Sequence, residues 1–304
     1  MKPTHTLHGL VAATHTPFHT DGSLNLPAVE LQAAHLLKND VTAAFIGGTT
    51  GESSSLTLDE RLALTQRWAE VAKGTAMRVV VHVGSNCLAD ARTLAAQAQQ
   101  LDAVAISALA PSYFKPRSVD ALIACCADIA AAAPETPFYY YDIPPMTGVA
   151  LSTLQFLEKA PAKIPTLVGC KASNPDLMAY LQCLHAGDWD IPWGVDEWML
   201  GALATGARGF VGSTYNFAAP IYHRLIAAFA RGDLVAARAE QLRSTQLVAL
   251  LARHGFMGAA KTTMGMLGVD VGPARLPNGS LSAEQAKTLR GEMEALGFFD
   301  WIKN

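Results

Sequence analysis

The chain has 304 residues, of which 50% are hydrophobic and 16% charged, and its net charge is −3. This size and apolar content are enough for one large core, because α/β barrels commonly reach this length as a single domain. The sequence pI of about 6.3 and the lack of a basic stripe argue against nucleic acid or an anionic membrane surface as a partner.

Short apolar runs alternate with helical patterns along most of the chain. Eight of these runs are predicted as buried strands, over residues 10–13, 43–46, 79–83, 104–106, 138–141, 167–170, 191–194 and 209–212. Helices are predicted over 27–38, 58–73, 88–100, 119–132 and 220–230, with two or three more in the remainder. Thr57 and Glu60 have the spacing of a capping box at the start of the second helix.

Eight buried strands that are each followed by a helix indicate a parallel sheet covered on both sides. Because no domain linker interrupts the pattern, we expect an α/β fold of the (β/α)₈ TIM barrel type over residues 1–230. Residues 231–304 are expected to form a C-terminal helical extension packed on the barrel. A doubly wound open sheet is the alternative, but the glycine-rich phosphate fingerprint that it needs is missing.

Lys171 stands at the end of the apolar run over 167–170. An unpaired ammonium is costly to bury, desolvation lowers the pKa of a lysine, and a neutral amine attacks ketones. The alternative is a rim residue whose stem packs while its head reaches water. Position alone leaves these two interpretations equal.

The segment Gly47-Gly48-Thr49-Thr50-Gly51-Glu52-Ser53 follows the second predicted strand. Its glycines let the backbone approach a ligand, and its N–H groups and hydroxyls can form a small anion cradle. A carboxylate suits this cradle better than a triphosphate, because the Gly-Lys-Ser/Thr of a P-loop is absent. The alternative is a tight turn with ordinary helix capping.

The aromatic run over 138–141 places Tyr139 and Tyr141 on one face of a strand and Tyr140 on the other. Most aromatic clusters on strands belong to the core. Tyr141 differs because it is last before Asp142-Ile143-Pro144, at the barrel end where chemistry takes place. A phenol there can transfer a proton if neighbours match its pKa.

Asp196 and Glu197 follow the seventh predicted strand, next to Gly194. Adjacent acids bind sugar hydroxyls well, and the alternative is an acidic helix N-terminus favoured by the helix dipole. They lack a nearby histidine or third acid, and the pair His15 and His19 also lacks a third ligand, so no metal is expected.

The sequence gives no sign of export. Residues Met1 to His5 lack the apolar segment of a signal peptide, and the alanine-rich stretch over 121–133 is too short to cross a membrane. The five cysteines are odd in number and have no Cys-x-x-Cys spacing, which is typical of free thiols in a reducing cytosol. We therefore expect a cytoplasmic protein.

Taken together, these motifs resemble the family of pyruvate-dependent class I aldolases that includes N-acetylneuraminate lyase and dihydrodipicolinate synthase. The resemblance covers nearly the whole chain. Its motifs are Gly48 to Glu52, Tyr141 to Pro144 and Gly169 to Ser173, with Gly194 to Glu197, Gly212 to Asn216 and Gly272 to Pro277 resembling the sialic acid lyases of the family.

The resemblance implies a retro-aldol reaction without a cofactor. Lys171 would form an iminium with the C2 ketone of open-chain N-acetylneuraminate, and Tyr141 would take the proton of the C4 hydroxyl. Cleavage of the C3–C4 bond would release N-acetylmannosamine and leave pyruvate. Thr49 and Thr50 would hold the carboxylate, and the Thr50 hydroxyl would also orient Tyr141.

The remaining implied residues bind the rest of the substrate or come from a second subunit. Gly194, Asp196, Glu197 and Ser213 match positions that hold the sugar chain, and Ser173 matches one near the N-acetyl group. Tyr113 matches an aromatic that reaches into a neighbouring subunit's site, and the family suggests a homotetramer.

Two positions depart from the family pattern. Asp142 stands where many microbial members carry asparagine, which adds a possible charge beside Tyr141. Met146 stands where the synthases carry an arginine for the second substrate's carboxylate, and a thioether cannot pair with that anion. Aldolases and dehydratases for other 2-keto-3-deoxy sugar acids remain the alternative, and a catalytically silent keto-acid sensor is disfavoured because both Lys171 and Tyr141 are present.

Overall fold

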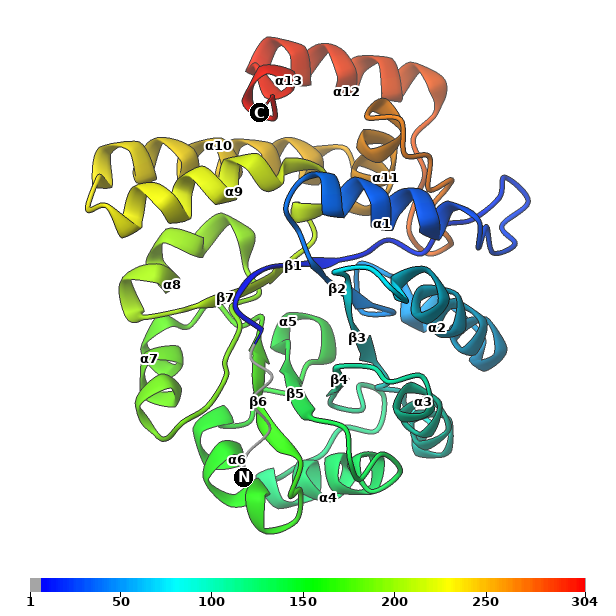
Figure 1. The fold of residues 1–304 in the computed structure, drawn as a ribbon, viewed down its shortest axis with the longest axis vertical. Coiled ribbons are helices and arrows are strands. Elements are labelled where there is room, and N and C mark those ends of the chain that lie inside the picture. The colour runs from blue at the N-terminus through cyan, green and yellow to red at the C-terminus, as the bar shows by residue number, and fades with distance from the viewer. Residues whose placement is uncertain (1–6, 304) are drawn as a thin grey trace.

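Parallel strands form the centre of the molecule, and helices surround them (Figure 1). The computed structural model describes residues 7–303, so the segment Met1 to His5, on which the expectation of a cytosolic chain partly rests, lies outside it. The hydrogen-bonded order of the strands is β6-β5-β4-β3-β2-β1-β7. The strands are β1 (Gly9–Ala13), β2 (Ala43–Ile46), β3 (Arg78–His82), β4 (Ala105–Leu109), β5 (Phe138–Asp142), β6 (Leu167–Ala172) and β7 (Gly209–Gly212).

Residues 190–193 close the ring between β6 and β7 without forming a regular strand. The Ala172 amide donates to the Pro192 carbonyl at 2.9 Å, and the Trp193 amide donates to the Gly209 carbonyl at 2.9 Å. The predicted barrel is therefore confirmed, but the prediction of a regular seventh strand is wrong. Pro192 has no N–H, so the ladder is interrupted and only isolated bridges form on either side of it.

Helices alternate with the strands and form the outer layer. They are α1 (Ala28–Lys38), α2 (Leu58–Ala72), α3 (Leu88–Gln100), α4 (Val119–Ala130), α5 (Pro144–Thr147), α6 (Thr153–Lys159), α7 (Leu177–His185), α8 (Met199–Thr205) and α9 (Tyr215–Ala230). The predicted capping box is confirmed: the Glu60 amide donates to the Thr57 hydroxyl at 3.2 Å, and the Thr57 amide donates to the Glu60 carboxylate at 2.9 Å. Helix α9 begins five residues before the predicted start and is kinked at Ala218, two residues before Pro220.

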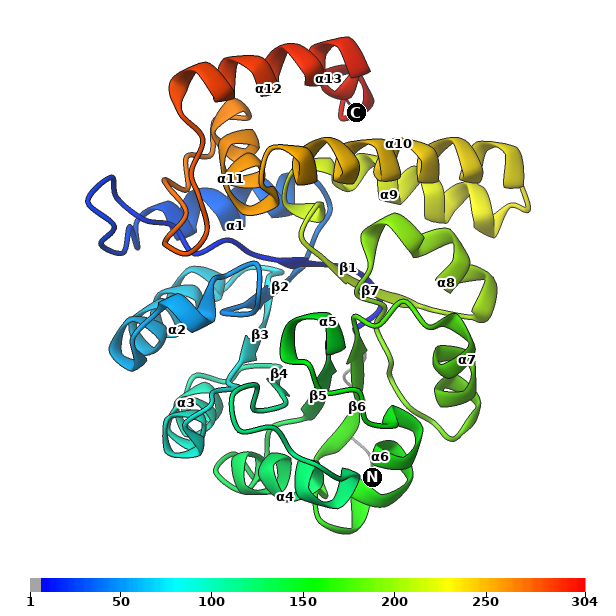
Figure 2. The same ribbon diagram turned by 180° about the vertical axis from the view of Figure 1, so that it is seen from behind.

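The C-terminal part of the chain is helical, with α10 (Leu234–Arg253), α11 (Phe256–Met266), α12 (Ala283–Leu296) and α13 (Phe298–Trp301). Within the described residues, this is one more helix than the two or three expected, and α13 is a single short turn. Helix α10 runs alongside α9 (Figure 2). Buried side chains of these helices, including Leu251, Met264 and Leu289, belong to the same hydrophobic cluster as the barrel helices. None of the helices described is long and apolar enough to cross a membrane.

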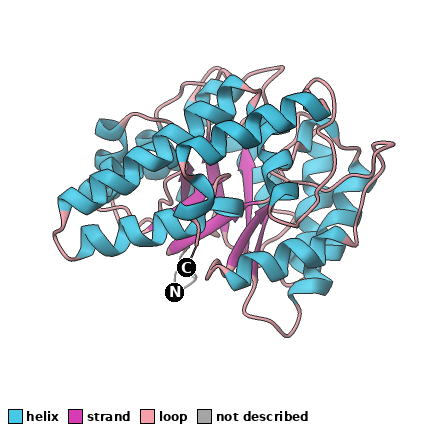
Figure 3. Ribbon diagram, turned by 90° about the horizontal axis from the view of Figure 1, so that it is seen from above, coloured by secondary structure: helices cyan, strands magenta, loops and turns pink. Residues whose placement is uncertain are grey.

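The strands carry apolar side chains on both faces, as expected for a sheet enclosed by helices (Figure 3). Tyr139 and Tyr141 belong to the cluster inside the barrel, together with Phe45 and Val80. Tyr140 belongs to the outer cluster between strands and helices. The predicted alternation of the three tyrosines is confirmed, and it directs Tyr141 toward the barrel axis.

Candidate active site

A cavity of about 510 Å³ opens where the strands end, beneath the short helix α5, which lies over the centre of the ring in Figure 2. This volume lies in the range of sites for small organic molecules. Every site residue that the sequence predicts within one subunit lines the cavity. These residues are Thr49, Thr50, Tyr141, Lys171, Ser173, Gly194, Asp196, Glu197 and Ser213.

Lys171 is the last but one residue of β6 and is only 4% exposed, so it is not a rim residue whose head reaches bulk water. Its Nζ lies 3.9 Å from the centroid of the Tyr141 ring and 4.1 Å from that of Phe45. Among the residues described, none forms a hydrogen bond or ion pair with this amine. The amine faces the cavity without such a partner, as the geometry of a carbonyl nucleophile requires.

Two adjacent threonines connect different strands of the site. The Thr49 hydroxyl lies 3.3 Å from the Tyr141 phenol oxygen, and the Thr50 hydroxyl lies 2.6 Å from the Ser213 hydroxyl. In this structure Thr49, and not Thr50, is the threonine next to the Tyr141 phenol, because the turn points the two neighbouring side chains in different directions. Thr49 faces the end of β5, whereas Thr50 faces the residue that follows β7.

Two carbonyls of the loop over 47–52 are bonded to residues that do not line the cavity. The Thr16 hydroxyl donates to the Gly51 carbonyl at 2.6 Å, and His82 Nδ1 lies 2.8 Å from the Gly47 carbonyl. Burial lowers the pKa of His82 to about 3, so its imidazole is neutral at physiological pH, and Nδ1 must carry the proton donated to this carbonyl. His82 is not among the residues predicted from the sequence, where its only signal is its place at the end of β3.

The two acids after residues 190–193 have different surroundings. Both lie in the short 3₁₀ helix η3 (Asp196–Trp198), and Asp196 accepts hydrogen bonds from the Thr214 amide at 2.9 Å and the Thr214 hydroxyl at 2.6 Å. Glu197 lines the cavity, and no other described residue donates a hydrogen bond to its carboxylate. Burial raises the pKa of both carboxyls. Glu197 is thus the acid that retains its hydrogen-bonding capacity for a ligand.

Two glycines are required by close approach. A Cβ on Gly194 would collide with the Ser173 hydroxyl, and one on Gly212 would collide with the Asp196 carboxylate. These glycines allow β6, β7 and residues 190–193 to bring their polar groups to one wall of the cavity.

The residues that depart from the family pattern lie in different places. Asp142 faces away from the cavity: it lines a separate cavity of about 410 Å³ beside α6 and α7, where the Thr153 hydroxyl donates to it at 2.9 Å. The expected charge beside the Tyr141 phenol is therefore on the opposite face of β5. Met146 lines the catalytic-side cavity and is 63% exposed at its mouth.

Tyr113, in the loop after β4, does not line the cavity of its own subunit. Its side chain is 78% exposed and packs edge-to-face against Phe114, which is 87% exposed. Within residues 7–303, no three His, Cys, Asp or Glu side chains are grouped so that they could hold a metal ion.

Comparison with known proteins gives consistent matches over the whole chain. Residues 6–296 match the model of the dihydrodipicolinate synthetase family. N-acetylneuraminate lyase of Gallus gallus is 38% identical over 303 residues, which covers 97% of this chain and 98% of the relative. The lyase of Danio rerio is 39% identical over 277 residues, covering 89% of this chain and 90% of the relative.

Solved structures agree with the sequence matches. N-acetylneuraminate lyase from Aliivibrio salmonicida superposes with a TM-score of 0.94 at 40% identity, covering 97% of this chain and 98% of that structure. The Proteus mirabilis lyase gives a TM-score of 0.93 at 39% identity, covering 97% and 100%. A dihydrodipicolinate synthase from Cyanidioschyzon merolae gives 0.87 at 29% identity, covering 97% and 99%. The chain therefore belongs to the dihydrodipicolinate synthetase family, and within it resembles N-acetylneuraminate lyases in sequence and structure.

Proposed function

We propose that this protein is a carbon–carbon lyase that cleaves N-acetylneuraminate to pyruvate and N-acetylmannosamine through a Schiff base on Lys171. The observation that carries the proposal is the buried Lys171 amine against the Tyr141 ring, in a cavity whose other wall carries Glu197. The names of the relatives that match nearly the full length support the same substrate.

The reaction begins with attack of the neutral Lys171 amine on the C2 ketone. Loss of water gives an iminium, which accepts the electron pair of the C3–C4 bond when that bond breaks. Tyr141 gives its phenol proton to the departing water as the iminium forms, and the resulting phenolate takes the proton of the C4 hydroxyl, so that C4 leaves as the aldehyde of N-acetylmannosamine. Tyr141 then returns this proton to C3 of the enamine, and hydrolysis of the iminium releases pyruvate and the free amine.

Binding groups are assigned by their place in the cavity. Thr49 and Thr50 hold the carboxylate with their N–H groups and hydroxyls, since their loop turns its carbonyls away. Gly194, Glu197 and Ser213 contact the hydroxylated chain of the substrate, and Ser173 lies near its N-acetyl group. Asp196 shapes this wall by holding Thr214.

We propose further that the protein is a cytoplasmic homotetramer in which Tyr113 enters a neighbouring subunit's site. The exposed Tyr113 and Phe114 rings support this assignment, because such an exposed aromatic pair is typical of a contact with another chain. Mass photometry of the purified protein tests the subunit count, with a mass near four times 32.2 kDa expected.

The test of the function is pyruvate release from a panel of sialic acids and other 2-keto-3-deoxy sugar acids. Fastest release from N-acetylneuraminate is expected, and K171R should abolish it because a guanidinium stays protonated and cannot form the imine. Borohydride reduction in the presence of pyruvate should leave a mass adduct on the peptide that carries Lys171. An adduct on another lysine, or faster release from a different keto acid, would contradict the proposal.

A further inference from the structure

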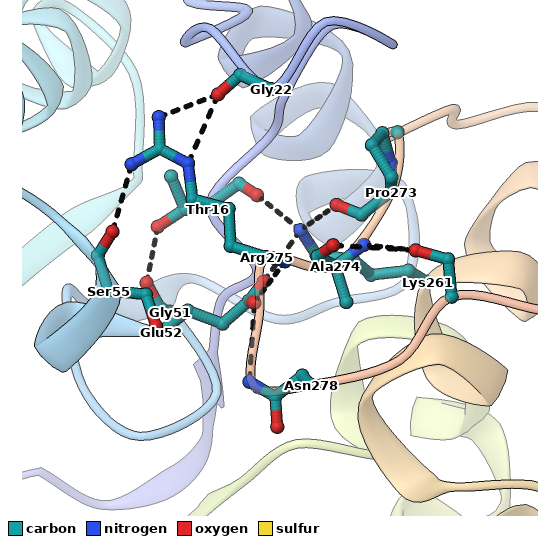
Figure 4. A network of polar contacts seen from close by, with 12 residues as sticks. Thr16, Gly22, Gly51, Glu52, Ser55, Lys261, Pro273, Ala274, Arg275 and Asn278 are labelled. Atoms are coloured by element: carbon teal, nitrogen blue, oxygen red, sulfur yellow. Dashed lines mark hydrogen bonds and ion pairs between the residues drawn. The ribbon is translucent and has the colours of Figure 1, made fainter.

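A second buried lysine lies outside the cavity, in the C-terminal part of the chain. Lys261 of α11 forms an ion pair with Glu52 at 2.7 Å, and the two side chains are only 1% and 0% exposed (Figure 4). Lys261 Nζ also donates to the Thr16 carbonyl at 2.9 Å and to the Pro273 carbonyl at 2.8 Å. The ammonium is thus engaged by one ion pair and two hydrogen bonds and does not reach the cavity, which argues against a role as a second nucleophile.

Glu52 is held equally firmly from the other side. Its Oε2 accepts a hydrogen bond from the Arg275 amide at 2.8 Å and from the Asn278 side chain at 3.3 Å (Figure 4). Its backbone is in the left-handed region, with φ of 53°, which residues other than glycine adopt only when their surroundings impose it. Glu52 is 4% exposed and does not line the cavity, so its carboxylate faces the C-terminal segment and not the ligand.

The position of this pair connects the C-terminal segment to the cradle for the substrate's carboxylate. Glu52 directly follows Gly51, and the Glu52 amide closes the turn by donating to the Thr49 carbonyl at 3.0 Å. The Thr16 residue whose carbonyl binds Lys261 uses its hydroxyl to hold the Gly51 carbonyl at 2.6 Å. One ammonium therefore fixes both the side chain at the end of the loop and the residue that holds the loop's backbone.

We propose that Lys261 and Glu52 are positioning residues for binding of the keto acid: their buried ion pair holds the loop over 47–52 so that Thr49 and Thr50 face the substrate's carboxylate. This inference rests on the proposed function. It also makes the C-terminal segment a necessary part of the active site, although none of Lys261, Arg275 or Asn278 lines the cavity.

The experiment compares Lys261→Met, Glu52→Gln and the double variant E52Q/K261M with the unmodified protein. The readout is the pyruvate concentration that gives half-maximal borohydride trapping on Lys171, measured by intact mass, with the thermal midpoint recorded in parallel. The matched control is Arg224→Met, which breaks the ion pair of Arg224 with Glu240 at 3.0 Å between α9 and α10, away from the cavity.

We expect half-maximal trapping on Lys171 to require at least roughly tenfold more pyruvate in K261M and in the double variant. The reason is that small displacements of binding groups have large effects on the reaction. The thermal midpoint of the double variant should be higher than that of K261M, since the double variant leaves no unpaired buried charge. Its affinity for pyruvate should stay as low as that of K261M. Arg224→Met should lower the midpoint while pyruvate trapping stays unchanged.

A double variant that folds and traps pyruvate at the unmodified concentration would overturn the positioning role. So would an Arg224→Met control that weakens trapping as much as K261M does. If K261M fails to fold, pyruvate trapping by the double variant is compared with that of the unmodified protein and decides the test. Trapping by E52Q provides an additional comparison. Failure of the unmodified protein to trap pyruvate on Lys171 would instead overturn the proposed function.

Discussion

The Tyr141 phenol oxygen lies 3.3 Å from the Thr49 hydroxyl, whereas the hydroxyl of the adjacent Thr50 contacts Ser213 at 2.6 Å. The two threonines therefore belong to different parts of the site. Thr49 is a neighbour of Tyr141, the group proposed to move the proton, and Thr50 joins the loop to the residue after β7. This division leads to different expectations for two nearly isosteric substitutions.

Thr49→Val should lower kcat by roughly tenfold to a hundredfold, because the phenol loses the hydroxyl that orients it for proton transfer. Thr50→Val should mainly raise the pyruvate concentration needed for trapping on Lys171, because it frees the loop from Ser213. Initial rates of pyruvate release and borohydride trapping measure the two effects separately. A larger loss of kcat in T50V than in T49V would contradict this assignment.

Glu197→Gln should weaken cleavage of N-acetylneuraminate without affecting the pyruvate adduct. A charged acceptor contributes roughly 1.5–3 kcal/mol, which corresponds to a loss of about tenfold to a hundredfold in kcat/KM. The pyruvate adduct should form normally, since pyruvate lacks the sugar hydroxyls that this carboxylate binds. Equal loss of trapping and cleavage would show that Glu197 supports Lys171 instead of the sugar.

Asp196→Ala should differ from the Glu197 variant by lowering stability as well. The buried Thr214 amide would lose its acceptor, which costs about 1–3 kcal/mol, while the Thr214 hydroxyl would keep only its contact with the Tyr222 hydroxyl. A lower thermal midpoint together with weaker cleavage is therefore expected for D196A, and an unchanged midpoint for E197Q. Equal thermal midpoints of D196A and E197Q would argue against a stabilising role of the hydrogen bonds between Asp196 of η3 and Thr214.

Met146 at the cavity mouth predicts discrimination between two family reactions. A synthase must bind an amino-acid semialdehyde with its own carboxylate, and a charge-assisted contact to it is worth roughly 1.5–3 kcal/mol. The protein should therefore cleave N-acetylneuraminate faster than it condenses pyruvate with aspartate semialdehyde, and M146R should narrow that difference. If condensation is faster in the unmodified protein, the proposed substrate is wrong even if Lys171 forms the adduct.

The parts of the fold that follow from local chemistry were predictable from the sequence. The capping box of Thr57 and Glu60 and the alternation of Tyr139 to Tyr141 each depend on neighbouring residues only. The burial of Lys171 at the end of β6 did not follow from position alone, which left a rim residue equally possible. Hydrophobic periodicity and lengths were sufficient to indicate a barrel. That residues after different strands line one cavity was also predictable, because the carboxyl ends of parallel strands all lie on one side of the barrel.

The parts that depend on pairing between distant segments were not predictable in this way. Nothing near Glu52 in sequence indicates that its partner is Lys261 on α11, and nothing near Asp196 indicates that Thr214 holds it. The orientations of Thr49 and Thr50 were also missed, because a turn has no fixed side-chain period. Pro192 differs, because its missing N–H can be read directly from the sequence. The regular spacing of the other strands nevertheless favours a regular strand at this place.

Asp142 gives a prediction of stability against pH. Burial raises the pKa of this carboxyl to about 6 from its ordinary value of 3.8, although the Thr153 hydroxyl acts against this by stabilising the charged form. Between these two pH values the folded state holds a proton that the unfolded state has released. The contribution of Asp142 to stability therefore falls as pH rises from about 4 to 6, and the full cost is present above pH 6.

Asp142→Asn removes this titration while keeping an oxygen that accepts from Thr153. The unfolding free energy of D142N should equal that of the unmodified protein near pH 4 and exceed it at pH 8, by up to roughly 3 kcal/mol. Denaturant unfolding at the two pH values measures the difference in unfolding free energy between D142N and the unmodified protein. Buried histidines such as His82 titrate in both proteins, so their contribution cancels in this difference. Thr153→Val is the matched control and should destabilise the protein more at pH 8 than at pH 4, because its hydroxyl bonds the charged carboxylate. Pyruvate release by D142N at pH 8 should be retained, since the side chain faces away from Tyr141.

The contradicting result is a difference in unfolding free energy between D142N and the unmodified protein that does not change with pH. It would show that folding does not raise the pKa of Asp142.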